Sequence, residues 1–128
     1  MPEQTKNIVQ TAFEALSRND LEALKAILDE DVQWSSADPA AEPDSTCWNR
    51  TEVIDTIDAW LQFGARPVIT EILVHGDRAL AALHLDGPPE LVGEIGADHF
   101  HVTVVRDDRV ASIVSYPDRE SAIVGLTA

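Results

Sequence analysis

The sequence has a single cysteine, Cys47, and few basic residues, with 9 Lys and Arg against 23 Asp and Glu. One cysteine cannot form an internal disulfide, and it excludes a zinc site built from cysteines. No apolar run approaches the roughly 20 residues that span a bilayer. The N-terminus lacks the basic segment followed by an apolar segment that marks a secretory signal. We therefore expect a soluble, cytoplasmic protein.

The shortage of basic residues extends over the whole chain, which carries a net charge of −14. Residues 1–64 hold 4 basic and 13 acidic side chains, and residues 65–128 hold 5 and 10. A stripe of Lys and Arg is needed to contact a phosphate backbone or an anionic membrane surface, and none is present. Neither nucleic acid nor membrane is an expected partner.

The chain has 128 residues, 45% of them apolar, which is the size and composition of one domain with its own core. Helices are predicted where apolar residues recur at helical spacing, and Asp20 is the expected N-cap of the second helix. An aperiodic segment with two prolines, residues 35–47, is predicted to be a loop. The predicted helices cover residues 5–18, 21–28 and 49–63.

The remaining sequence favours β structure, because Val, Ile and Leu are concentrated in segments bounded by turn residues. Gly76-Asp77 and Asp107-Asp108 are typical of tight turns, so the first and last pairs of strands form antiparallel hairpins. The predicted architecture is α+β, with three N-terminal helices packed in a curved antiparallel sheet. The predicted strands are residues 32–34, 68–75, 79–86, 99–106 and 110–116, with a connection at 87–96 and a final helical turn at 118–124.

Five short segments follow one another in a characteristic order: 19–24 (NDLEAL), 31–34 (DVQW), 50–54 (RTEVI), 104–110 (VVRDDRV) and 115–119 (SYPDR). Together they resemble the nuclear transport factor 2-like (NTF2-like) superfamily and, within it, the SnoaL-like branch. The resemblance implies a cone with an apolar pocket at its wide end, and a homodimer through the outer face of the sheet. Members include ketosteroid isomerases, limonene-type epoxide hydrolases and polyketide cyclases, so the fold does not name a reaction.

Two of the family chemistries lack their residues in this chain. The positions of the isomerase tyrosine and catalytic base fall on Ala12 and Ser36, and neither side chain can act in those roles. The Asp-Arg-Asp set of the epoxide hydrolases is also missing, with Ser115 immediately before Tyr116. The SnoaL-type cyclases need one Asp or His as acid and base for an aldol closure, and a histidine with a pKa near neutrality meets that need.

His99 and His101 are the catalytic candidates, with Tyr116 as a hydrogen-bond donor. The two histidines are two residues apart on a predicted strand, so they share one face. The opposite face, which carries Phe100, is the more apolar and is favoured for contact with the helices, which would turn the histidines outwards. A three-histidine metal site with His84 is disfavoured, and no metal or other cofactor is expected.

Large aromatic side chains are expected around the cone, where they give a flat apolar wall suited to a planar or cyclic, polyketide-like ligand. Trp48, at the end of the predicted loop, is the candidate lid. Two functions stay open: a protein that binds such a ligand unchanged, and a cofactor-free acid/base enzyme such as a cyclase, isomerase or dehydratase. The missing carboxylates favour the first. The expected ligand-binding residues are Phe13, Trp34, Trp48, Ile57, Trp60 and Phe100.

Overall fold

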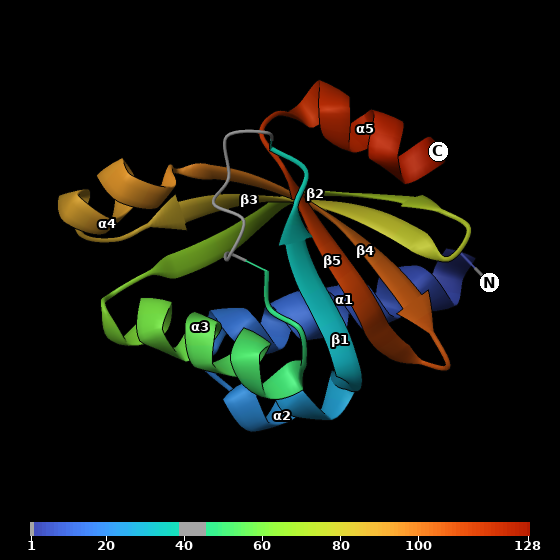
Figure 1. The fold of residues 1–128 in the computed structure, drawn as a ribbon, viewed down its shortest axis with the longest axis horizontal. Helices are drawn as coiled ribbons and strands as arrows, with labels where there is room; N and C mark the ends of the chain where they lie inside the picture. Colours follow the sequence, from blue (N-terminus) through green and yellow to red (C-terminus); the bar gives the residue numbers. More distant parts are fainter. Residues whose placement is uncertain (1, 39–45) are drawn as a thin grey trace.

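The computed structural model describes residues 2–38 and 46–128. Within them, five helices and five strands follow one another along the chain (Figure 1). No helix among these residues is long and apolar enough to cross a membrane. The elements are α1 Pro2–Ser17, α2 Leu21–Ile27, β1 Leu28–Ser36, α3 Arg50–Gln62, β2 Arg66–His75, β3 Arg78–Asp86, α4 Pro89–Ile95, β4 Asp98–Arg106, β5 Arg109–Tyr116 and α5 Arg119–Thr127.

The first three helices lie within a few residues of their predicted bounds, and side-chain caps define two of their starts. The Asp20 side chain accepts a hydrogen bond from the backbone N–H of Ala23 at the start of α2. Asn49 caps α3 in the same way through the N–H of Glu52. Both caps pair N–H groups that have no partner inside the helix.

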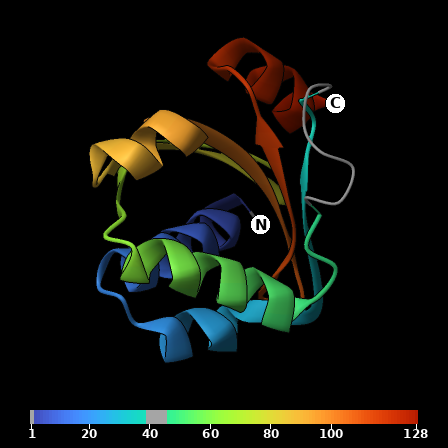
Figure 2. The ribbon, with the colours of Figure 1, turned by 60° about the vertical axis from the view of Figure 1, so that its left-hand side comes forward.

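The strands form one curved sheet in the order β1-β5-β4-β3-β2 (Figure 2). The predicted hairpins β2–β3 and β4–β5 are present and antiparallel. Asp107 and Asp108 both have a positive φ, as a type I′ hairpin turn requires. The edge strand β1, however, runs parallel to β5. The sheet is therefore mixed, which corrects the prediction of a purely antiparallel one.

Two segments are more regular than the sequence predicted. Residues 87–96, expected to be a connection, contain the helix α4. The expected final turn is the nine-residue helix α5, which Asp118 caps by accepting a hydrogen bond from the N–H of Ser121. The predicted loop at 35–47 lies mostly outside the described residues.

Helices cover both faces of the sheet (Figure 2). The inner face packs against α1, α2 and α3, where Leu28, Val32 and Val53 are almost completely buried. On the outer face, Leu80 packs against Leu126 of α5. The outer face, to which the resemblance assigns a dimer interface, is thus partly occupied by the chain's own C-terminal helix.

Candidate functional site

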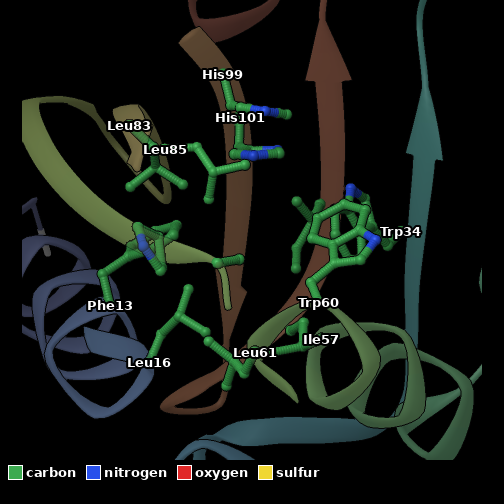
Figure 3. A pocket seen from close by; sticks show the side chains of 13 residues that line it. Phe13, Leu16, Trp34, Ile57, Trp60, Leu61, Leu83, Leu85, His99 and His101 are labelled. Carbon is green, nitrogen blue, oxygen red and sulfur yellow. The ribbon is translucent and has the colours of Figure 1, made fainter. Parts of the chain in front are cut away.

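A pocket lies between the inner face of the sheet and the helices α1 and α3 (Figure 3). Its volume is about 80 Å³. Among the described residues the lining is hydrocarbon apart from two imidazole rings and two indole rings, and none of these residues has a carboxylate, lysine or arginine side chain. The lining residues are Phe13, Leu16, Trp34, Ile57, Trp60, Leu61, Ala65, Pro67, Leu83, Leu85, His99, His101 and Ile113.

Strand β4 places His99 and His101 in this pocket (Figure 3). The sequence favoured the opposite arrangement, in which the face carrying Phe100 meets the helices and the histidines point outwards. That prediction is wrong because helices cover both faces of the sheet. Phe100 and Val102 pack beneath α5 against Ala122. A strand buried on both faces gives little hydrophobic contrast from which to tell the inner side.

His101 is the buried polar centre of the pocket, with 5% of the residue exposed. Its Nδ1 lies 2.9 Å from the hydroxyl oxygen of Ser115, and the indole N–H of Trp34 donates to the same oxygen at 2.8 Å. An indole N–H can only donate, so the hydroxyl accepts from Trp34 and has its own proton to donate to Nδ1. In this arrangement Nδ1 accepts from the hydroxyl, and we assign the proton of the neutral imidazole to Nε2.

Burial, together with the smaller effect of neighbouring His99, lowers the pKa of His101 to about 3. An imidazolium at this position would lose its hydration without gaining a carboxylate partner. His101 is therefore neutral at physiological pH. Its Nε2 has no hydrogen-bond partner among the described residues and is not fully enclosed by protein. The Nε2–H is thus a donor that a molecule in the pocket can use.

The His99 ring stacks on His101, with ring centroids 6.0 Å apart and planes inclined by 13°. Its Nε2 lies 2.9 Å from the carbonyl oxygen of Gly96. A carbonyl oxygen only accepts, so Nε2 carries the proton, and Nδ1 of the neutral ring is a proton acceptor. The pocket therefore combines one fixed donor on His101 with one basic nitrogen on His99.

Trp34 and Trp60 complete an aromatic cluster around the two histidines. The two indole rings meet edge to face, with centroids 5.4 Å apart. Trp34 lies 5.8 Å from His101 and Trp60 lies 6.4 Å from His99, measured between ring centroids. These contacts restrict the rotation of both imidazole rings, so the direction of each ring nitrogen is set by packing as well as by hydrogen bonds.

The structure separates the sequence-predicted site residues into two groups. Trp48, the candidate lid, is 62% exposed and is not among the residues that line the pocket. Phe100 and Tyr116 belong to the cluster beneath α5, on the other side of the sheet. Tyr116 follows the inward-facing Ser115, and strand alternation turns it outwards. The predicted residues that do line the pocket are Phe13, Trp34, Ile57, Trp60, His99 and His101.

His84 lies away from the other two histidines. On β3 it pairs with Asp98, whereas the neighbouring Leu83 pairs with His99 and lines the pocket. Its ring nitrogens are 3.2 Å from Asp86 and 3.3 Å from Asp98. Within the described ranges, no group of three or more His, Cys, Asp or Glu side chains is placed to hold a metal ion.

Comparisons with known proteins identify the class of protein that this fold and pocket define. Residues 9–113 match the family model of the SnoaL-like domain. The chain therefore belongs to the SnoaL-like family, within the NTF2-like superfamily. No curated protein matches the sequence.

Solved structures of proteins named for three different enzyme activities share the fold. A candidate polyketide cyclase from Sinorhizobium meliloti has a TM-score of 0.70 and 19% identity, over 85% of this chain and 93% of that one. A candidate ketosteroid isomerase from Kribbella flavida has a TM-score of 0.69 and 19% identity, over 92% of this chain and 81% of that one. An LEH-like epoxide hydrolase from M. tuberculosis has a TM-score of 0.69 and 17% identity, over 98% of this chain and 91% of that one. At these identities the likeness concerns the fold alone.

Proposed function

We propose that the pocket binds a small, neutral and mainly apolar molecule, cyclic in shape, through an oxygen that accepts a hydrogen bond from Nε2 of His101. The observation that carries this proposal is the chain of hydrogen bonds from Trp34 through Ser115 to His101. It fixes a neutral donor inside a hydrocarbon pocket. A carbonyl oxygen pairs with that donor, whereas a ligand without an acceptor leaves it unpaired, which costs binding energy.

The lining also limits the ligand's charge and size. A charged ligand would give up its hydration and meet no opposite charge among the lining residues. The volume of about 80 Å³ is small beside the roughly 300 Å³ at the lower end of typical ligand clefts. The ligand is therefore of one-ring size, or the aromatic walls move to admit a larger one.

Matched probes test this function. 4-Methylacetophenone and 4-ethyltoluene have nearly the same shape, but only the first has a carbonyl oxygen. We expect the ketone to bind roughly 10-fold more tightly, since one buried hydrogen bond corresponds to about 1.4 kcal/mol. His101→Phe keeps a ring and removes the donor, so it should abolish the preference. NMR titration of the tryptophan indole N–H signals measures both affinities, and equal binding of the two probes by the unaltered protein would refute the proposal.

A second candidate is a cofactor-free acid/base enzyme, which the stacked His99–His101 pair favours. Nδ1 of His99 would take a proton from the carbon next to the ligand's carbonyl, while Nε2–H of His101 holds the enolate oxygen. In a ligand with a β,γ carbon–carbon double bond, return of that proton to the γ-carbon moves the double bond and gives an isomerisation. Attack of the enolate carbon on a second carbonyl of the same molecule gives a cyclisation, with the proton passing to the new alkoxide.

Hydrogen–deuterium exchange separates the enzyme from the binding protein. If His99 acts as a base, the acetyl protons of 4-methylacetophenone should exchange in D₂O faster with the protein than without it. His99→Gln should remove the acceleration while the ketone still binds through His101. An exchange rate that is the same with the unaltered protein and with His99→Gln would leave binding as the function.

A further inference from the structure

We propose that the ligand site continues beyond the main pocket into a second cavity, where Thr103 receives a second oxygen of the ligand. The inference rests on the proposed function and specifies its ligand. The second cavity has a volume of about 50 Å³ and is lined by residues of α1, α2, α3 and the strands β1, β4 and β5. Of the described residues that line it, Thr103 is the polar one, and the others are Val9, Ala12, Phe13, Leu16, Leu24, Leu28, Val53, Ile57, Val110 and Ile113.

The Thr103 hydroxyl has no hydrogen-bond partner within the part of the chain that the structure describes. The residue is 3% exposed, and among the described residues its Oγ1 is the one fully buried side-chain oxygen or nitrogen without a hydrogen-bond partner. Leaving a hydroxyl unpaired in an apolar space costs free energy, and buried polar groups in folded proteins are nearly always paired. An oxygen of a bound molecule would supply the missing partner.

The two cavities adjoin one another. Phe13, Leu16, Ile57 and Ile113 line both of them. Two residues of α1, one of α3 and one of β5 are therefore common to both linings. The proposal requires these shared side chains to adjust so that the two cavities join and one molecule can reach from His101 to Thr103.

The strand sets the distance between the two anchors. His101 and Thr103 are successive inward-facing residues of β4. Two residues along a strand span roughly 6–7 Å, so the side chains would hold two oxygens about that far apart. The Thr103 hydroxyl can donate and accept, and it can pair with a hydroxyl or a carbonyl. The geometry points to ring compounds that carry oxygens at opposite ends, such as a para-hydroxy aryl ketone.

A second probe pair tests this subsite. 4-Hydroxyacetophenone differs from 4-methylacetophenone by a hydroxyl in place of the ring methyl, on the side opposite the carbonyl. We expect the unaltered protein to bind the hydroxy ketone roughly 10-fold more tightly in NMR titrations. Thr103→Val has the same shape without the hydroxyl and should erase this preference. Thr103→Ser, which retains the hydroxyl, should keep it.

The thermal stability of the free variants gives an independent readout. Because Oγ1 is unpaired, Thr103→Val should melt at the same temperature as the unaltered protein or higher. A clear fall in melting temperature would show that the hydroxyl is a structural group, and it would overturn the inference. A hydroxyl preference that is absent from the unaltered protein, or that persists in Thr103→Val, would overturn it as well.

The probes also tell the two proposals apart. If the protein prefers 4-methylacetophenone over 4-ethyltoluene but gains nothing from the added hydroxyl, the main pocket binds a carbonyl and only the Thr103 subsite is refuted. If none of the three probes binds, the proposed function fails and the subsite fails with it.

Discussion

The hydroxyl of Ser115 lies 2.9 Å from Nδ1 of His101, and the two residues face each other across the adjacent strands β5 and β4. Trp34 extends this contact to the edge strand β1. Three neighbouring strands are therefore linked through side chains on the face that lines the pocket. The contact both stabilises the sheet and decides which nitrogen of His101 is presented to a ligand.

Ser115→Ala should lower the free energy of unfolding by about 1–3 kcal/mol, because the Trp34 N–H and the His101 ring lose their shared partner. Urea denaturation measures the loss. Ser112→Ala is the matched control, since Ser112 is on the same strand and its side chain makes no hydrogen bond with the described residues. Equal losses in the two variants would mean that the network contributes nothing to stability.

The buried His101 makes stability depend on pH. Its pKa is about 3 in the folded protein against 6.5 for an ordinary histidine. Between these values the unfolded chain binds the proton and the folded chain does not, so stability rises with pH from 3 to 6.5 and is lost as the pH falls. At pH 5 the loss from this one group is roughly 2 kcal/mol relative to pH 7, at about 1.4 kcal/mol per pH unit.

Unfolding curves of His101→Phe over this range test that dependence. The variant should lose the part of the slope between pH 5 and 6.5 that His101 causes, because it has no imidazole to protonate on unfolding. His75→Phe removes an exposed histidine and serves as the control. A slope that is the same in His101→Phe and the unaltered protein would show that His101 is protonated in the folded state.

The sequence predicts helices and hairpins well here, because their signals are local. The caps at Asp20 and Asn49 and the turn at Asp107-Asp108 are contained within a few residues. The parallel pairing of β1 with β5 joins strands that are far apart in the chain, and the sequence of neither strand indicates which strand it will pair with. The sequence did not predict the helix α4, because Pro88 and Pro89 favour a loop. Proline is also compatible with the first turn of a helix, and here the two residues begin one.

The partner of His101 could not be predicted for a related reason. Counting from the turn, where Arg106 pairs with Arg109, His101 would pair with Val114. A register shift between Val104 and Val105 moves its partner to Ser115. An extra residue in one strand exchanges the faces of everything beyond it, and sequence patterns do not show where one occurs.

Tryptophan signals should distinguish the pocket from the surface. Trp34 and Trp60 line the pocket, whereas Trp48 is 62% exposed. We expect 4-methylacetophenone to shift the indole N–H signals of Trp34 and Trp60 in NMR spectra and to leave that of Trp48 in place. Single Trp→Phe variants assign the three signals. A shift confined to Trp48 would move the binding site to the surface.

Two helical glycines should respond in opposite ways to replacement by alanine. Alanine favours a helix over glycine by about 1 kcal/mol. A Cβ at Gly93 in α4 would meet no atom within 4 Å, so Gly93→Ala should stabilise the protein by up to that amount. A Cβ at Gly125 in α5 would clash with the ring of Tyr116. Gly125→Ala should therefore destabilise the protein by about 1–3 kcal/mol, as overpacking does in other cores.

A further experiment tests whether the Tyr116 ring causes the expected loss of stability in Gly125→Ala. In a double-mutant cycle, Tyr116→Ala should remove most of the penalty of Gly125→Ala, because the clash needs both side chains. The energies of the two changes should then differ from their sum by most of that penalty. If the two energies simply add, the cost of Gly125→Ala does not depend on the Tyr116 ring, and the clash is not its cause.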